Sequence, residues 1–179
     1  MGKPLDRITG MADAFRAANK LNCAFVMLGH GRWALIDYED VEAVWRCKWH
    51  LTDNRYVRSH LGGSGSRYLE NGMGLHRYLV KPSKGMDVDH INGDTQDCRR
   101  SNLRLATRAQ NLANGKRRSH NKASKFKGVR RHFKKWVARI RCNGKSTHLG
   151  TFNTERQAAI AYNEAAVKLF GEFARPNEV

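Results

Sequence analysis

The chain has 179 residues, enough for one ordinary domain or for two small ones. No apolar run approaches the roughly 18 residues of a membrane span, and the first residues lack a secretory pattern, so we expect a cytoplasmic protein. Four widely spaced cysteines without a C-x-x-C pair argue against a zinc ribbon and against a disulfide framework.

Positive charge is concentrated in the last third of the chain. The formal net charge is +17, and residues 116–179 carry 16 basic and 4 acidic side chains, against 17 and 12 in residues 1–115. A positive field of this strength attracts polyanions, because their bound counterions are released. We therefore expect a nucleic acid as partner. The alternatives are a basic solubilising face and an anionic membrane surface, which is the weaker one because no basic amphipathic helix is present.

The first 80 residues predict short strands and helices. Met11, Phe15 and Ala18 fit one side of a helix with poor caps. The other expected elements are a strand at 33–36, a helical segment at 41–45, a strand at 56–61, a glycine- and serine-rich loop at 62–66 and a returning strand at 67–69. We expect three tryptophans to pack in or near the core rather than to stack on bases: Trp33, Trp45 and Trp49.

Residues 87–115 predict a strand, a loop, a second strand and a helix. The expected elements are a strand end at 87–90, a turn at Asn92-Gly93, a strand at 103–106, and a helix that Thr107 caps, that runs to about Asn114 and that Gly115 ends.

The segment 115–124 (GKRRSHNKAS) is polar and basic and has no residue that could anchor a core, so we interpret 116–123 as a linker. Beyond it the sequence predicts three short strands and one helix. Asn143-Gly144 is a strong hairpin signal between the second and third strands. The expected elements are strands at 128–132, 136–142 and 147–152 and a helix at 154–170, with Thr154 as N-cap and Gly171 as stop.

Four polar residues in 87–115 stand at characteristic intervals. Asp89 and His90 end the first predicted strand, Asn102 precedes the second, and Asn111 lies on the following helix. In spacing and residue type this segment resembles the HNH endonucleases, especially those of phage homing enzymes, in which asparagine replaces the last histidine. The resemblance implies a ββα-metal motif in which Asp89 and Asn111 bind the metal, His90 is the general base, and Asn102 orients the histidine ring.

These residue types suit phosphodiester hydrolysis. The reaction needs an activated water and a counter-charge for the phosphate and the leaving oxygen, which one divalent cation can supply. Oxygen ligands favour a hard ion, Mg²⁺ or else Mn²⁺, over zinc. A histidine with an ordinary pKa of about 6.5 can take a proton from water near neutral pH.

Taken singly, each of these residues also fits an ordinary structural role, as a turn former, a strand histidine or a solvent-facing helix residue. Only their joint spacing favours catalysis. Upstream, His76-Arg77 matches a His-Arg pair that members of the family often carry near the site. Arg77 could contact a phosphate, and a purely structural pair is at least as good an interpretation.

The segment 124–179 resembles the DNA-binding domain of plant ethylene-response (Apetala-type) transcription factors, a domain that also occurs in phage HNH nucleases. The matching pieces are SKFKGVRR (124–131), KWVARIR (135–141), LGTF (149–152) and QAAIAYNEAAVKLFGEFARPN (157–177). The resemblance implies a three-stranded sheet that enters the major groove and is backed by the helix.

The DNA contacts carried over from that family are Arg130, Trp136 and Arg141, and we add Arg139, because arginine can bond guanine in pairs or clamp phosphate. Arg139 stands where plant members usually have an acid, and His148 where they often have tryptophan, so plant base preference should not be transferred. Alternation along the second strand separates Trp136, Ala138 and Ile140 from Val137, Arg139 and Arg141. Core positions are expected at Phe126, Phe152, Tyr162, Leu169 and Phe170.

We predict an α+β protein: a small N-terminal α+β region with a ββα-metal nuclease motif, then a three-stranded antiparallel sheet packed on one helix. The domains are expected at 1–115, with a nuclease core at 74–115, and at 124–179, joined by the basic linker 116–123. The further expected phosphate contacts are Arg77, Lys116, Arg117 and Arg118.

The predicted function is site-directed cleavage of double-stranded DNA by a homing endonuclease, in a bacterial host cell if a phage encodes it. One HNH unit attacks one strand, so a monomer should nick DNA and a weak dimer could cut both strands. Neither a protein partner nor a membrane is implied. The alternative is a non-catalytic DNA-binding regulator with a vestigial HNH fold. An RNA-binding protein fits less well, because the aromatic platforms of single-strand readers are missing from the pattern.

Overall fold

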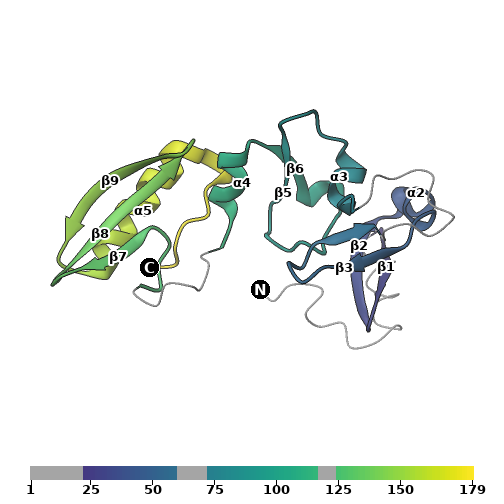
Figure 1. Cartoon of the computed structure of the whole chain (residues 1–179), viewed down its shortest axis with the longest axis horizontal. Helices are drawn as coiled ribbons and strands as arrows, with labels where there is room; N and C mark the ends of the chain where they lie inside the picture. Colours follow the sequence, from purple (N-terminus) through teal and green to yellow (C-terminus); the bar gives the residue numbers. More distant parts are fainter. Residues whose placement is uncertain (1–21, 60–71, 117–123) are drawn as a thin grey trace. The chain divides into compact units, whose positions relative to one another are not determined.

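The computed structural model of the chain describes residues 22–59, 72–116 and 124–179 (Figure 1). The chain divides into two compact units: Met1–Lys84 with His90–Leu105, called the N-terminal unit, and Gly85–Asp89 with Ala106–Val179, called the C-terminal unit. Within the described ranges, no helix is both long and apolar enough to cross a membrane. Several expectations lie outside the described residues: the helix around 11–18, the loop at 62–66, the strand at 67–69, and Arg117 and Arg118.

Short antiparallel strand pairs and short helices build the N-terminal unit. Its elements are β1 (Cys23–Gly29), β2 (Arg32–Asp37), η2 (Tyr38–Asp40), α2 (Val41–Trp45), β3 (Trp49–Leu51), β4 (Val57–Ser59), α3 (Leu75–Val80) and η3 (Arg100–Asn102). β1 pairs with β2 and β3 with β4. The strands β5 (Asp87–His90) and β6 (Leu103–Ala106), in which the chain passes from one unit to the other, form a further two-stranded sheet.

The predicted strand at 33–36 and helical segment at 41–45 are confirmed, and β4 confirms the described part of the strand at 56–61. The three-residue strand β3 was missed. Trp49 is buried, and its indole N–H donates to the carbonyl of Val44 at 2.8 Å, while Trp33 is half-buried. The core position for Trp45 is wrong, because its side chain is 71% exposed. Helix α2 buries Val44, and the next residue of a helix points about 100° away.

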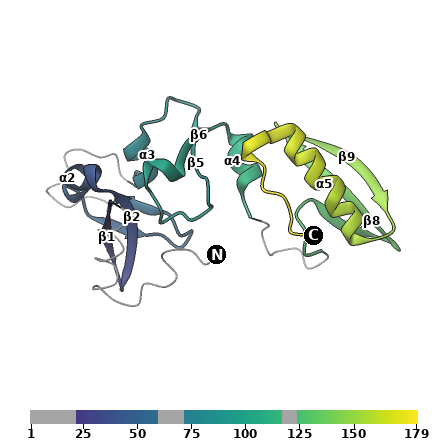
Figure 2. The ribbon, with the colours of Figure 1, turned by 180° about the vertical axis from the view of Figure 1, so that it is seen from behind.

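A three-stranded antiparallel sheet with one long helix across one face dominates the C-terminal unit, as Figure 1 and, from behind, Figure 2 show. The strand order is β7-β8-β9, and α5 packs on the sheet. The elements are α4 (Arg108–Asn114), β7 (Val129–His132), β8 (Lys135–Cys142), β9 (Lys145–Phe152), α5 (Glu155–Phe170) and η4 (Gly171–Phe173). The predicted α+β class with a helix-backed sheet is thereby confirmed.

The helices of this unit begin where the capping signals placed them. The hydroxyls of Thr107 and Thr154 accept hydrogen bonds from the amides of Gln110 and Gln157, whose side chains bond back to the caps. Such reciprocal boxes satisfy amides that a helix start leaves unpaired. The turn between β8 and β9 has φ of 48° at Asn143 and 80° at Gly144, the positive angles that two-residue hairpins favour.

The core of the C-terminal unit lies between the sheet and α5. One cluster joins Ala158 and Ala159 to Phe126, Val129 and Ala138, and the other joins Tyr162, Ala166 and Phe170 to Ile140 and to Ala113 of α4. Trp136, Ala138 and Ile140 therefore share the side that faces α5, as their alternation predicted. The core position for Leu169 is wrong: this side chain is 50% exposed, because it lies off the stripe of α5 that packs on the sheet.

Two glycines with nearly the same backbone angle test how closely this core is packed. Gly128 has φ +77°, and a Cβ there would lie 2.0 Å from the Tyr162 ring and 2.7 Å from the Arg139 carbonyl oxygen; Gly144 has φ +80° and nothing within 4 Å. Gly128→Ala should therefore combine backbone strain with overpacking and lower the free energy of unfolding by about 2–5 kcal/mol. Gly144→Ala should cost only the strain, about 1–2 kcal/mol. Urea unfolding measures both, and equal losses would contradict the close approach at Gly128.

Candidate functional site

The general-base candidate lies in an aromatic cluster of the N-terminal unit. His90 is 4% exposed, and its ring centroid lies 5.1 Å from that of His76 and 6.2 Å from that of Tyr56. Gly74 allows this arrangement, because a Cβ there would lie 2.6 Å from His76 Cε1. The structure thus brings His76, which the sequence left between a structural and a functional role, into ring contact with His90.

The thiol of Cys98 faces the same histidine. Its Sγ lies 3.9 Å from His90 Nε2. Burial raises the pKa of this thiol far above its usual range, and the neighbouring Asp97 and Asp94 carboxylates add to the effect. The sulfur therefore stays protonated at neutral pH and places no negative charge beside the imidazole.

Asn102 fixes the loop that follows His90. Its amide nitrogen donates to the carbonyl of Asp97 at 2.7 Å and to Asn92 Oδ1 at 3.1 Å, while its Oδ1 accepts from the Asn92 amide at 3.0 Å. Its backbone carbonyl accepts from the amide of Ile91 at 2.9 Å. These bonds hold the two residues that come directly after His90, and orientation of the ring itself by Asn102 stays a prediction.

Ion pairs and backbone bonds anchor this loop on β2 and η2 of the N-terminal unit. The amide of Cys98 donates to the carbonyl of Leu35 at 2.8 Å. The guanidinium of Arg100 bonds the buried carboxylate of Asp40 at 2.7 and 3.1 Å. Such two-pronged, charge-assisted contacts fix both distance and orientation, so the segment that carries Asn102 has a defined place.

Carboxylates of β5 face amides of α4 within the C-terminal unit. Asp87 and Asp89 are two residues apart on a strand and share one side of it, and Asn111 and Asn114 share one face of a helix. Asn111 Nδ2 donates to Asp87 Oδ2 at 2.9 Å, and Asn114 Nδ2 donates to both carboxylate oxygens of Asp89, at 2.9 and 3.0 Å. We call this arrangement the carboxylate–amide ladder.

The ladder differs from the expected ligand pair of Asp89 and Asn111. The amide bonded to Asp89 is that of Asn114, which is 6% exposed, whereas the half-buried Asn111 is bonded to Asp87. Sequence reasoning missed Asp87 and Asn114. Their signal was present, because aspartates at i and i+2 and asparagines at i and i+3 each fall on one face.

The donors around Asp89 and Asn111 fit a hard divalent cation. Carboxylate and amide oxygens are the ligands that Mg²⁺ accepts, with several waters retained. Among the described residues, no three histidine, cysteine, aspartate or glutamate side chains form a group that could hold a metal ion. A site with one carboxylate and one amide does not require such a group.

Three of the predicted DNA contacts share the sheet face that is turned away from α5. Arg130 pairs with Val137, Arg139 with His148 and Arg141 with Ser146, and all three arginines are exposed. Residues that pair across antiparallel strands point to the same side, and Val137, Arg139 and Arg141 alternate along β8 with the residues that face α5. The structure therefore gathers these guanidinium groups on one open surface.

The fourth predicted contact, Trp136, lies on the other side of the sheet. Its half-buried ring packs against the cluster of Phe126, Val129 and Ala138, with the guanidinium of Arg131 5.2 Å from the ring centroid. Of the expected phosphate contacts, Arg77 is half-buried on α3, next to His76, and Lys116 is exposed after the end of α4.

A groove of about 670 Å³ lies between α4 and β8. Its lining includes Arg108 and Leu112 of α4, Arg139 and Arg141 of β8, and Tyr162 of α5. Arg108, which sequence reasoning missed, also forms an ion pair with Asp87 at 3.3 Å. Three basic residues of α4 and β8 therefore take part in the lining of this groove: Arg108, Arg139 and Arg141.

Comparisons with known proteins cover both parts of the chain. A family model described as HNH endonuclease matches residues 81–113. An uncharacterised HNH endonuclease of Acanthamoeba polyphaga mimivirus is 35% identical over 164 residues, which make up 87% of this chain and 81% of the relative. No solved structure matches the chain.

Plant proteins match a smaller segment. An ethylene-responsive transcription factor of Arabidopsis thaliana is 48% identical over 61 residues, 30% of this chain and 38% of the relative. A dehydration-responsive element-binding protein of the same plant is 48% identical over 66 residues, 35% of this chain and 32% of the relative. The chain thus spans about a third of the length of these plant relatives, whereas it matches the viral relative over most of both lengths. The chain therefore belongs to the HNH endonuclease family.

Proposed function

We propose that the protein is a metal-dependent endonuclease that cleaves double-stranded DNA at a preferred site, as a homing enzyme does. The observation that carries the proposal is the pair of consecutive, buried residues Asp89 and His90 on β5. Successive side chains of a strand point to opposite sides. The carboxylate is bonded to an amide of α4, and the imidazole contacts the rings of His76 and Tyr56.

In this proposal Asp89 and an amide oxygen of α4, that of Asn111 by resemblance, would hold one divalent cation, Mg²⁺ by preference. When bound, the cation polarises the phosphate and stabilises charge on the leaving oxygen. His90 takes the proton of the attacking water. Asn102 holds the loop behind the histidine, and the thiol of Cys98, which burial keeps protonated, adds no negative charge of its own beside the imidazole.

Recognition is assigned to the C-terminal sheet. Arg130, Arg139 and Arg141 face outwards together, where they can reach base edges or phosphates. Lys116 and, outside the described residues, Arg117 and Arg118 would follow the phosphate backbone, as would Arg77. The packing of Trp136 beneath Arg131 favours a supporting role for the tryptophan over a base contact.

A DNA-binding regulator with an inactive HNH motif is the second candidate, and one observation favours it. Both oxygens of Asp89 accept hydrogen bonds from Asn114, and the residue is 4% exposed, as a purely structural carboxylate would be. The two candidates differ in whether metal and DNA together give a cut product.

Purified full-length protein should nick duplex DNA of its host locus in Mg²⁺ or Mn²⁺ and not in EDTA. His90→Ala should lower the nicking rate about 10²- to 10⁴-fold and keep its affinity in a gel shift, because proton transfer and binding use different residues. His30→Asn, at an exposed histidine in the β1–β2 turn, is the matched control and should nick normally. Undiminished nicking by His90→Ala would remove this residue from the mechanism, and a wild type that cuts nothing would support the regulator.

Substitution of the two asparagines of α4 should affect different properties: Asn114 mainly the stability of the fold, and Asn111 mainly the Mg²⁺ requirement. Asn114→Ala removes two bonds to the buried Asp89 and should lower the free energy of unfolding by about 1–3 kcal/mol, whereas Asn111→Ala loses one half-exposed bond and should cost about 1 kcal/mol or less. Asn111→Ala should instead raise the Mg²⁺ concentration needed for half-maximal nicking. Urea unfolding without metal and a Mg²⁺ titration measure the two effects. If Asn114→Ala raised the Mg²⁺ requirement and Asn111→Ala lowered the free energy of unfolding more, Asn114 would be the amide ligand.

The arginines of the sheet should contribute to base preference, whereas Lys116, beside the linker, should contribute only to overall affinity for DNA. Arg130→Ala or Arg141→Ala should cost about 1–3 kcal/mol on the preferred site and blur preference at one or two positions. Lys116→Ala should weaken all sequences alike and lower the salt slope by about one unit. Binding to a randomised site at several salt concentrations distinguishes these outcomes. A uniform loss from the arginine variants would show that they only clamp phosphate.

A further inference from the structure

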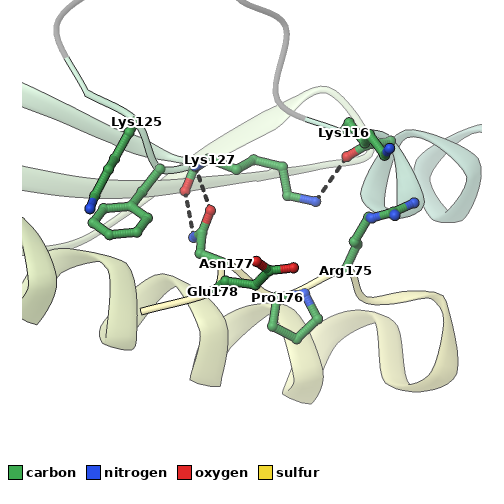
Figure 3. Close-up of a pocket in the computed structure, with 9 residues that line it drawn as sticks. Lys116, Lys125, Lys127, Arg175, Pro176, Asn177 and Glu178 are labelled. Carbon is green, nitrogen blue, oxygen red and sulfur yellow. Dashed lines mark hydrogen bonds between the residues drawn. The ribbon is translucent and has the colours of Figure 1, made fainter. Parts of the chain in front are cut away.

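Helix α4 is tied to the sheet domain at its own C-terminal end. Lys127, just before β7, extends its side chain to this end, toward Lys116 (Figure 3). Its Nζ donates to the carbonyls of Ala113 at 2.6 Å and of Gly115 at 3.1 Å. The last carbonyls of a helix have no partner within the helix and carry the negative end of its dipole. A lysine ammonium therefore satisfies two of these oxygens and matches their charge.

Lys127 is itself held in place. Asn177 bonds both backbone groups of Lys127, accepting from its amide at 2.6 Å and donating to its carbonyl at 3.1 Å (Figure 3). Asn177 is in turn bonded to Asn163 of α5. Burial and the nearby Arg175 lower the pKa of Lys127 to about 8, so the amine stays mostly protonated at neutral pH. The lysine is thus a fixed cation and not a mobile surface chain.

Apolar packing fixes the same helix. Ala113 belongs to the core cluster of Ile140, Tyr162 and Phe170, and Ala109 packs against that cluster. Ile140 lies on β8 between Arg139 and Arg141, two of the arginines assigned to DNA. One continuous core therefore joins the helix of the carboxylate–amide ladder to the strand that bears the reading side chains.

We infer that the docking of α4 through Lys127 and Ala113 sets the distance along DNA between the bases that the sheet reads and the bond that is cut; this rests on the endonuclease function proposed above. The carboxylate–amide ladder ties Asp87 and Asp89 to α4, and the shared core ties α4 to the sheet. Residues 117–123 lie between α4 and the sheet in the sequence. The chain before this segment and the chain after it are already joined directly, because Lys127 bonds the carbonyl of Gly115. Lys127 is thus a positioning residue that determines cleavage specificity, and the length of 117–123 does not.

The test maps cut positions at single-nucleotide resolution on end-labelled target DNA, with full-length protein in Mg²⁺. Five glycine and serine residues inserted between Arg118 and Ser119 should leave the cut at the same bond as in the wild type. A cut that moves or spreads over several bonds on insertion overturns the inference and leaves the proposed function standing. A wild type that cuts nowhere overturns both.

A second series addresses Lys127 directly. Lys127→Met in the insertion background should spread the cuts over several bonds, because the side chain no longer ties the end of α4. Lys127→Arg keeps the charge and the donors and should restore the single position, and Lys125→Met, on an exposed neighbour, should behave as its parent. A merely destabilised protein would lose rate without losing position. A single, unmoved cut with Lys127→Met in a folded protein would therefore overturn the role of Lys127.

Discussion

The contact on which the proposed site depends most is the one between Asp89 and Asn114. A carboxylate that is 4% exposed loses most of its hydration, which is costly unless hydrogen bonds replace the lost water. The amide of Asn114 supplies two of these bonds. This contact fixes strand β5 against helix α4, and through the core cluster around Ala113 it connects the carboxylates with the helix-backed sheet.

The same strand serves the two compact units in different ways. Its aspartates belong to the C-terminal unit, while His90 belongs to the N-terminal unit, with His76, Tyr56 and the anchored loop of Asn102. The metal-ligand candidate Asp89 and the base candidate His90 are therefore held next to each other by the chain itself. Each has its own supporting structure, so a substitution behind the imidazole need not disturb the carboxylates.

Local chemistry made much of the fold predictable. The strands, the hairpin and the helices of the C-terminal unit follow from Thr107, Thr154 and Asn143-Gly144, whose preferences act over a few residues. What escaped prediction depends on tertiary register. Sequence spacing could not tell which amide of α4 meets which aspartate of β5. Nor could it tell that Trp45, on a helix of five residues, faces solvent, or that Lys127 meets backbone carbonyls, since a carbonyl has no signature in the sequence.

The shared core around Ala113 limits how this protein can be recombined. A chimaera joined within 116–123 would keep α4 but remove its support, leaving Ala113 and Ala109 without the apolar surface of Ile140, Tyr162 and Phe170. The donor of a new DNA-binding domain would have to present a matching surface and a cation for the end of α4. Any exchange of the sheet in this chain is therefore constrained by α4, most of which lies in the segment that the HNH family model matches but which packs on the sheet.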